Sequence, residues 1–341
     1  MKAAVTTKPG HLEIKEVPAG HPGPGEVLLD IQVVGLCGSD VHLFRGDHPY
    51  VRYPAIQGHE FSAVVAEVGP GKPGCLRAGD LVAVEPLRPC GNCLACRRGH
   101  PNCCRDLAVV GAHIDGALSE SLVVPASSCY VVGDLPPDLA ALVEPTSIGL
   151  QAVTRSGISA GDQVIVLGAG PIGQTATMAA TDLGARVLAV DLLDNRLAIA
   201  RQVGAEVTIN ASSQDVAVAV TQWAGEDGPV AVIEATGQPE LIRLAVGMVA
   251  HSGTVVVVGI TMKEVTLPVV DFSRKEINLL GSRNNAGLFG QAVELVRRHR
   301  EHARHMITHR FGFSDVLAAM TLAAERPQEA GKVLVSIGAA A

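Results

Sequence analysis

Two groups of residues in the first half of the chain have the types and spacing of metal ligands. In the stretch PCGNCLACRRGHPNCC, Cys90, Cys93 and Cys96 are each separated by two residues, and seven residues separate Cys96 from Cys104. Four thiolates in one short loop suit a closed tetrahedral zinc site. Disulfides or an iron–sulfur cluster are the alternatives, although the last spacing differs from that of short ferredoxin motifs. Cys103 and Cys104 are both candidates for the fourth position. Neighbouring residues rarely point at one tetrahedral centre, so only one of them is expected to be a ligand.

The second group combines a thiol, imidazoles and carboxylates. It is spread over three segments: Cys37, Asp40 and His42 in CGSDVH, His59 and Glu60 in GHE, and Glu144 in LVEP. Taken singly, each has a structural explanation as a buried thiol, a core histidine or a surface acid. Together they offer the mixed nitrogen, oxygen and sulfur ligands, with an open position, that a catalytic zinc requires. Zinc acting as a Lewis acid lowers the pKa of an alcohol, which then releases hydride to a cofactor.

A glycine motif farther along the chain predicts where such a cofactor binds. The apolar run 164–167 leads directly into Gly168-x-Gly170-x-x-Gly173, and a second apolar run ends in Asp191. In a strand–turn–helix context, the three glycines serve the tight turn, the approach of a pyrophosphate and close helix packing, and the helix N-terminus faces the phosphates. An ordinary glycine-rich turn is the alternative. The carboxylate of Asp191 accepts ribose hydroxyls and repels a 2′-phosphate, so the motif favours NAD over NADP.

The elements around these groups indicate two domains in the 341 residues. Short apolar runs broken by Pro and Gly predict a β-rich domain over the first ~130 residues, with mainly antiparallel pairing. From 159 onward strands and helices alternate, which implies a parallel sheet with helices on both faces. The alternating segments are 163–168, 172–184, 186–191, 194–203, 205–210, 214–224, 230–235, 239–250 and 254–259. Helices near 288–299 and 314–325 follow, and the strand KVLVSI is expected to return to the first domain.

Composition restricts the partners and the compartment. The net charge of -7 gives no reason to propose nucleic acid or an anionic membrane as a partner. No basic segment followed by an apolar run marks a signal peptide, and the apolar runs fall short of the ~20 residues of a membrane helix. Clustered cysteines in a chain with a cofactor motif fit metal binding in a reducing cytosol, so a cytoplasmic location is expected.

In combination, these motifs resemble the zinc-dependent medium-chain dehydrogenase/reductase family over essentially the whole chain. The resemblance is carried by CGSDVH, GHE, the four-cysteine loop, the EP dipeptide, GAGPIG and the acid that ends the second strand. Within the family it is closer to the polyol and sugar-acid branch, which includes sorbitol, threonine and hexonate 5-dehydrogenases. The reason is Glu144, which stands where simple alcohol dehydrogenases place a cysteine. One departure is Ala63, where the family usually reads glycine in GHE-x-x-G.

The resemblance implies a ligand set for each of two zinc ions per subunit. Cys37 and His59 would bind the catalytic zinc directly, Glu60 would bind it directly or through water, and Glu144 would be the remaining carboxylate. The structural zinc would be held by Cys90, Cys93, Cys96 and Cys104, since Gly99 and Asn102 also fit the family spacing and favour Cys104 over Cys103.

The resemblance also implies roles in proton transfer and cofactor binding. Ser39 would take the proton of the alcohol, His42 would pass it outward through the nicotinamide ribose, and Glu60 belongs to the same catalytic group. Asp40 would hydrogen-bond the ring of His59 from the second shell. The expected cofactor-binding residues are Gly168, Gly170, Pro171, Ile172, Gly173, Asp191 and Arg196.

Four residues are candidates for substrate contacts. Arg45, together with His48, lies in the loop that follows His42, and could pair with a carboxylate or hydroxyls; a solvent-exposed loop is the alternative. In GSRNNAG, Arg283 and Asn284 follow the last strand of the cofactor domain. The histidine-rich stretch 299–309 is expected to be an exposed helix rather than a metal site.

The resemblance thus implies an α/β protein with a Rossmann-type doubly wound parallel sheet and a β-rich GroES-like catalytic domain. Residues 1–146 and 285–341 would form the catalytic domain, and 147–284 the NAD-binding domain, in a homodimer or homotetramer. The expected reaction is oxidation of a secondary alcohol of a polyol or sugar acid to a ketone. Alternatives are a threonine 3-dehydrogenase-like or other secondary-alcohol dehydrogenase, a zinc-free NADPH-dependent reductase, and a non-catalytic NAD-binding protein.

Overall fold

The computed structural model describes residues 1–47, 52–71 and 74–338, so His48 lies outside the described residues. The chain divides into two compact units. Unit 1 comprises Met1–Glu144, Phe289–Arg300 and Ile307–Ala341, and unit 2 comprises Pro145–Leu288 and Glu301–Met306. The domain boundaries at 146/147 and 284/285 stay a prediction.

Unit 2 is built on a six-stranded parallel sheet with the strand order β13-β12-β11-β14-β15-β16. Its central strands are buried on both faces, which is why they read in the sequence as continuous apolar runs rather than as alternating patterns. The strands are β11 (Gln163–Leu167), β12 (Arg186–Asp191), β13 (Val207–Asn210), β14 (Ala231–Glu234), β15 (Thr254–Val257) and β16 (Asn278–Gly281).

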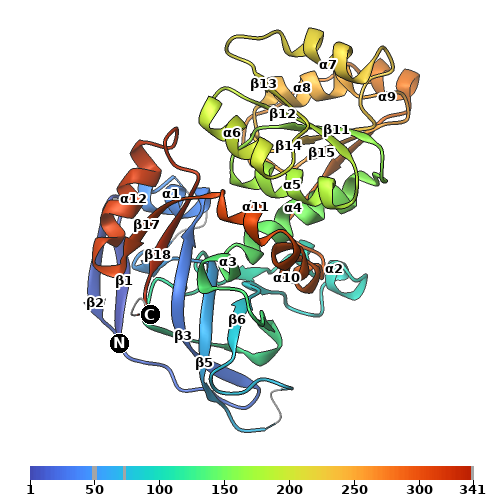
Figure 1. Cartoon of the computed structure of the whole chain (residues 1–341). Helices are drawn as coiled ribbons and strands as arrows, with labels where there is room; N and C mark the ends of the chain where they lie inside the picture. The colour runs from blue at the N-terminus through green and yellow to red at the C-terminus, as the bar shows by residue number, and fades with distance from the viewer. Residues whose placement is uncertain (48–51, 72–73, 339–341) are drawn as a thin grey trace. The chain divides into compact units, whose positions relative to one another are not determined.

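Helices cover both faces of this sheet. Figure 1 shows α5 and α6 on one face and α7, α8 and α9 on the other, so the predicted doubly wound arrangement is confirmed. The helices are α4 (Val143–Ser156), α5 (Pro171–Asp182), α6 (Asp194–Gln202), α7 (Val216–Ala224), α8 (Pro239–Met248), α9 (Val269–Lys275) and α11 (Arg300–Arg304). The histidine-rich stretch therefore contains only the short helix α11 before a strand begins at Ile307.

Unit 1 is β-rich and contains three sheets. The largest has the order β10-β6-β5-β3-β18-β17, with β9 also paired to β3; its strands are β3 (Glu26–Leu36), β5 (Glu60–Val68), β6 (Leu81–Val84), β9 (Ser121–Pro125), β10 (Cys129–Val131), β17 (Ile307–Gly312) and β18 (Lys332–Ser336). The smaller sheets are β2-β1-β4, from β1 (Lys2–Lys8), β2 (His11–Glu16) and β4 (Ala55–Ile56), and the pair β7 (Leu87–Arg88) and β8 (Ala108–Val109). Within the described part of this unit, β17 and β18 pair in parallel and the other strand pairs are antiparallel.

The described α-helices of unit 1 have between four and ten residues. They are α1 (Gly38–Arg45), α2 (Leu94–Arg97), α3 (Pro137–Ala140), α10 (Phe289–Arg298) and α12 (Val316–Glu325). The last of these packs on the core of the large sheet and contributes Val316, Ala319 and Met320 to it. Strand β18 is the closing strand expected from KVLVSI, and it pairs antiparallel with β3 in the middle of the sheet.

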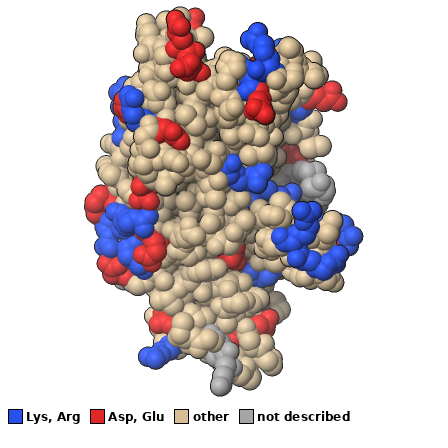
Figure 2. Space-filling view, turned by 90° about the vertical axis from the view of Figure 1, so that its right-hand side faces the viewer, with Lys and Arg blue, Asp and Glu red and all other residues tan. Residues whose placement is uncertain are grey.

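The surface and the helix lengths give two further observations. Among the helices of the described part of the chain, none combines the length and the apolar character needed to cross a membrane. On the face seen in Figure 2, Lys and Arg side chains lie in several separate groups, some beside Asp or Glu, rather than as one continuous basic surface.

Candidate metal and dinucleotide sites

Strand pairing in unit 1 brings three of the predicted ligands together. Cys37 directly follows β3, and His59 and Glu60 stand at the start of β5. Because β3 and β5 are antiparallel with Gly35 opposite Glu60, the end of one strand lies beside the beginning of the other. One ligand atom each from Cys37, His59 and Glu60 therefore lies within 4.8 Å of the other two.

A glycine on β3 leaves the space that the Glu60 carboxylate occupies. A Cβ atom at Gly35 would lie 2.6 Å from Oε2 of Glu60, which is closer than any real contact of that kind. Any larger residue at Gly35 would therefore displace the carboxylate from the ligand group.

The Glu60 carboxylate is also held by Lys332, a site residue that sequence reasoning missed. Nζ of Lys332, on β18, donates to Oε1 and Oε2 of Glu60 at 2.8 and 2.5 Å, and to the carbonyl oxygen of Leu36 at 3.3 Å. Burial disfavours the charged amine, but the negative charges of Glu60, Cys37 and Glu144 outweigh it and raise the pKa of Lys332. A lysine that opens an otherwise apolar strand was the available signal.

Asp40 connects the two segments that carry Cys37 and His59. Its Oδ2 accepts from the backbone N–H of Cys37 at 2.9 Å, and its Oδ1 accepts from that of Gly58 at 3.3 Å. The ring Nδ1 of His59 lies 3.8 Å from Oδ1 of Asp40, which is too long for the expected hydrogen bond. This nitrogen is buried, and none of the described residues hydrogen-bonds to it.

Charge within this buried cluster shifts the pKa of its members. Burial raises the pKa of Asp40, although the neighbouring His59 opposes the shift. For His59, burial works against the cation, but Asp40, Cys37 and Glu144 together raise its pKa well above the usual value. Burial, with the nearby charges of Glu60 and Asp40, raises the pKa of Glu144 to about 7.

The remaining predicted catalytic residues lie around this cluster. Glu144, in the first turn of α4, is buried but is not one of the three residues whose ligand atoms converge. Ser39 is half-buried in the first turn of α1. His42, one turn later, is exposed, and its Nδ1 lies 2.9 Å from Oδ1 of Asp47.

The donor set fits a divalent cation. Three buried carboxylates (Asp40, Glu60 and Glu144) and one thiol surround the site, and among the described residues Lys332 places a permanent cation beside them. A buried cluster of acids with so little compensation is costly, and a metal bound by sulfur, nitrogen and oxygen would relieve it.

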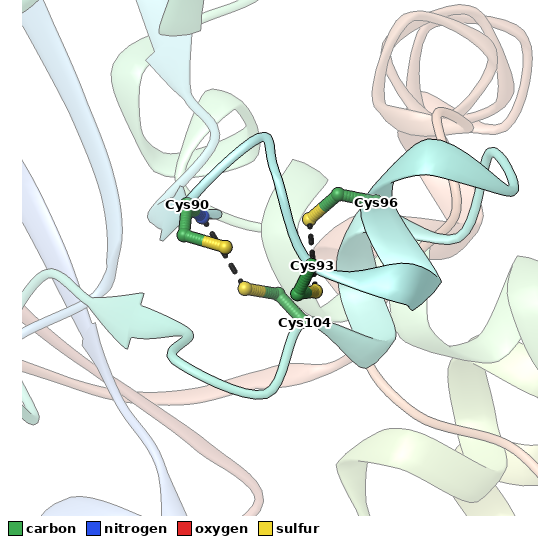
Figure 3. Close-up of side chains that lie close together, drawn as sticks. All are labelled: Cys90, Cys93, Cys96 and Cys104. Atoms are coloured by element: carbon green, nitrogen blue, oxygen red, sulfur yellow. Dashed lines mark hydrogen bonds between the residues drawn. The ribbon is translucent and has the colours of Figure 1, made fainter.

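The four-cysteine loop folds into a second convergent group. Figure 3 shows the sulfur atoms of Cys90, Cys93, Cys96 and Cys104 turned toward one another, and all four lie within 4.8 Å. Four thiolates at tetrahedral zinc would have sulfur atoms about 3.8 Å apart, given Zn–S bonds of about 2.3 Å. The Cys93 and Cys96 sulfurs are 3.5 Å apart. Cys104 is buried in the group, whereas its neighbour Cys103 is exposed.

Without a cation the four thiols do not share one protonation state. Backbone N–H groups of Cys96 and Arg105 lower the pKa of Cys93 to about 6. Burial, with the thiols of Cys93 and Cys104, raises the pKa of Cys96 to about 12. A bound metal would hold all four as thiolates, so this group fits a structural zinc.

The glycine motif of unit 2 has the expected close contacts. Gly168 has φ +94°, a left-handed conformation that favours glycine. A Cβ at Gly173 would lie 1.8 Å from the carbonyl oxygen of Gly168, so helix α5 can approach the turn only with glycine there. A Cβ at Gly170 would meet only Nη1 of Arg196, at 4.0 Å, so this position opens to space. Pro171 and Ile172 form the first turn of α5.

Asp191, at the end of β12, is held by the backbone around it. Its Oδ2 accepts from Ala169 N at 2.7 Å, and its Oδ1 accepts from Leu192 N at 2.8 Å and Leu193 N at 3.1 Å. A carboxylate can accept about four hydrogen bonds. The three hydrogen bonds from the backbone therefore leave about one acceptor position for a ribose hydroxyl. Nη1 of Arg196 lies 3.9 Å from Oδ2 of the same carboxylate.

A buried acid on the neighbouring strand shapes the turn that packs against the glycine motif. Glu234, at the end of β14, accepts hydrogen bonds from Thr236 N at 2.7 Å, from Gly237 N at 3.0 Å and from the Thr236 hydroxyl. A Cβ at Gly168 would lie 2.6 Å from Cγ2 of Thr236, so this turn closes directly on the motif. Sequence reasoning did not single out Glu234.

The predicted substrate contacts have another partner in unit 1 or belong to unit 2. The guanidinium of Arg45 donates to the carbonyl oxygen of Ala324, near the C-terminus of α12, so it connects two helices of unit 1. Arg283 is exposed in unit 2, and Asn284 has φ +46°, a conformation that asparagine tolerates better than most residues. The next residue, Asn285, is buried and accepts from Leu288 N at 3.3 Å.

Comparison with known proteins identifies the family. Residues 23–134 match the alcohol dehydrogenase GroES-like domain, and residues 171–298 match the zinc-binding dehydrogenase domain. L-galactonate-5-dehydrogenase of Escherichia coli is 35% identical over 92% of both chains, and sorbitol dehydrogenase of Gallus gallus is 34% identical over 93% of this chain and 91% of its own. The structure of an alcohol dehydrogenase from E. coli CFT073 with NADH superposes with a TM-score of 0.91, at 31% identity and 99% coverage of both chains.

The chain therefore belongs to the zinc-dependent medium-chain dehydrogenase/reductase family. It is an oxidoreductase of the polyol and sugar-acid branch, as the resemblance implied, and its GroES-like and Rossmann-type parts are confirmed.

Proposed function

We propose that this protein oxidises a secondary alcohol of a polyol or sugar acid to a ketone, with NAD as the hydride acceptor and a catalytic zinc held by Cys37, His59 and Glu60. The observation that carries the proposal is the convergence of these three ligand atoms within 4.8 Å in a buried cluster of acids. The bound zinc would supply Lewis-acid polarisation of the substrate hydroxyl.

The chain's own residues would orient the ligands and move the proton. Glu144 would complete the zinc shell, directly or through water, and Asp40 would fix the segments that carry Cys37 and His59. The Ser39 hydroxyl would accept the alcohol proton, and His42, exposed one turn later, would pass it to solvent. The four-cysteine loop would hold a structural zinc without a catalytic part.

Dinucleotide binding would use the glycine motif and Asp191. The open space at Gly170 accommodates a pyrophosphate, and Arg196 lies beside both this glycine and the Asp191 carboxylate. The acceptor position left on Asp191 suits a ribose hydroxyl and opposes a 2′-phosphate. An Asp191→Ser variant should therefore shift the ratio of kcat/KM values toward NADP, and an unchanged ratio would exclude this role.

The decisive test compares Cys37→Ala with Cys75→Ala, a control that removes an exposed cysteine distant in sequence from both clusters. Cys37→Ala should lose one of two zinc ions and nearly all turnover while retaining NADH binding. Cys75→Ala should behave like wild type. A non-catalytic NAD-binding protein, or a zinc-free reductase, would tolerate Cys37→Ala in these assays.

The substrate class is decided by NADH production with paired polyols and the matching sugar acids. Both classes occur among the names of similar proteins: L-galactonate-5-dehydrogenase is named for a sugar acid, and sorbitol dehydrogenase for a neutral polyol. Preference for the acids would call for a cationic substrate contact, for which Arg283 is the exposed candidate. Preference for neutral polyols would assign Arg283 another role, and activity confined to threonine would favour the threonine dehydrogenase alternative.

We also propose a cytoplasmic homodimer or homotetramer. All eight cysteines are free, which suits a reducing compartment. The family resemblance motivates the oligomer, and light scattering of the purified protein would measure its mass directly.

A further inference from the structure

A glutamine is fully buried two residues before the ligand His59. Gln57 has no exposed surface, and its side chain lies between β1 and the first turn of α1. A buried amide is costly unless its donors and acceptors have partners. This glutamine has them on both sides, from segments far apart in the sequence.

The two hydrogen bonds of the amide fix its orientation. The hydroxyl of Thr6, on β1, donates to Oε1 of Gln57 at 2.6 Å. Nε2 of Gln57 donates to the carbonyl oxygen of Asp40 at 2.7 Å. Reversing the amide would face its NH₂ group toward a hydroxyl and its oxygen toward a carbonyl, so only this orientation makes both bonds with Thr6 as the donor.

The network continues to the ligand segments through Asp40. The side chain of Asp40 accepts from the backbone N–H of Cys37 and from that of Gly58, which adjoins His59. The backbone carbonyl of Gln57 accepts from Leu118 N at 2.9 Å, which anchors the glutamine from a further segment. The main chain of Asp40 is thus held by Gln57, while its side chain holds both ligand segments.

We propose that Gln57, supported by Thr6, is a positioning residue for the catalytic zinc ligands, because it fixes the turn carrying Cys37 against the segment carrying His59. This inference rests on the proposed catalytic zinc. Fully satisfied buried polar networks favour one arrangement over its alternatives, and loss of one member leaves the others with unpaired groups. Sequence reasoning did not single out Gln57, since no motif of the site includes it.

The test measures zinc affinity and ligand geometry in the full-length protein. Affinity is obtained by competition with a chelator of known affinity, and geometry from the sulfur-to-metal absorption of the cobalt-substituted protein. The variants are Gln57→Leu, which removes both side-chain bonds, Thr6→Val, which removes only the hydroxyl, and Thr6→Ser, which retains it. The control is Ser119→Ala, which removes a buried hydroxyl of the same unit that lies within donating distance of the carbonyl oxygens of Gly116 and Ser121.

Gln57→Leu should weaken zinc binding at the catalytic site about 10- to 100-fold, in the range found for partners of metal ligands. Its cobalt absorption should shift, while the zinc of the four-cysteine loop is retained. Thr6→Val should change zinc affinity and cobalt absorption in the same direction as Gln57→Leu, whereas Thr6→Ser should leave both unchanged. The Thr6→Val/Gln57→Leu double variant should bind zinc no more weakly than Gln57→Leu. Ser119→Ala should leave both readouts at their wild-type values.

Wild-type affinity and absorption in Gln57→Leu would overturn the inference, as would equal losses in Gln57→Leu and Ser119→Ala. If Gln57→Leu does not fold, identical zinc affinity in Thr6→Val and Thr6→Ser overturns it. Cys37→Ala separates this failure from that of the proposed function. If it retains both zinc ions, the catalytic zinc itself is refuted; if it loses one while Gln57→Leu does not, only the positioning role is refuted.

Discussion

Replacing Lys332 by methionine tests the electrostatic account of the buried cluster around Glu60, the proposed catalytic zinc site. The Lys332 and Glu60 side chains are 2% and 1% exposed and pair at 2.5 Å. Removing one partner of a buried ion pair costs about 3–5 kcal/mol, because the remaining charge is left without compensation. In metal-free protein we therefore expect Lys332→Met to lower the free energy of unfolding of unit 1 by about that amount. Bound zinc should reduce the loss, since it supplies a second cation beside the carboxylate.

Urea unfolding separates this effect from general damage. With a slope of about 3 kcal/mol/M, the loss corresponds to a shift of the midpoint by about 1 M or more. Circular dichroism follows the whole chain, whereas Trp223, the single tryptophan, lies in unit 2 and should report an unchanged transition. Lys332→Arg keeps the charge and should retain most of the stability, and Glu60→Gln/Lys332→Met should recover part of the loss.

A small effect would refute this reasoning. If Lys332→Met lowers the free energy of unfolding by less than about 1 kcal/mol, the pair behaves like an exposed salt bridge. If Glu60→Gln/Lys332→Met is as unstable as Lys332→Met, the uncompensated carboxylate is not the cause.

Three further predictions concern the cysteine loop and the dinucleotide site. In zinc-loaded protein, iodoacetamide should label Cys103 but not Cys104, and removal of zinc by a chelator should expose Cys104 to labelling. Mass spectrometry identifies the labelled cysteine; labelling of Cys104 but not Cys103 in zinc-loaded protein would show that Cys103 is the ligand. Gly173→Ala should destabilise unit 2 by about 1–3 kcal/mol in thermal unfolding, because its methyl group would overlap the preceding turn, whereas Gly170→Ala should not; equal stabilities would contradict the packing. Glu234→Gln should lower the stability of unit 2 by about 1.5–3 kcal/mol, measured by tryptophan fluorescence, since its carboxylate accepts from three donors in one turn; wild-type stability would rule out this role.

The parts of the fold that depend on neighbouring residues could be predicted from the sequence. The alternation that follows 159 corresponds to the strands and helices of the parallel sheet, because buried strands and glycine turns leave local patterns. The same holds for the Cys90–Cys104 loop, where the spacing of the cysteines restricts their geometry. Helix α1 was not predicted, since it is only eight residues long and half of its residues are polar.

The contacts that depend on distant residues could not be predicted. Lys332 lies 272 positions from Glu60, and no local sequence pattern identifies Glu60 as its partner. Arg45 was a candidate for reading a substrate carboxylate, but its guanidinium donates to a helix carbonyl 279 positions away. A cationic side chain in a loop looks the same in sequence whether it binds a ligand or a helix end. Gln57 is a similar case, because its burial follows from the positions of β1 and α1.

The position of β18 has a consequence for how the protein is made. Most of unit 2 is one continuous segment, Pro145–Leu288, so it can fold as soon as that stretch leaves the ribosome. Unit 1 begins at the first residue, yet its central strand β3 receives β18, with Lys332, only when residues 332–336 have been synthesised. Until then Glu60 has no lysine beside it, and residues Val33–Leu36 of β3 lack the strand that pairs with them opposite β5. The segments that carry Cys37, His59 and Glu60 are therefore synthesised first, but they acquire their last neighbouring strand only after residues 332–336 are made. Unit 2 is synthesised later, yet we expect it to fold before unit 1 is complete.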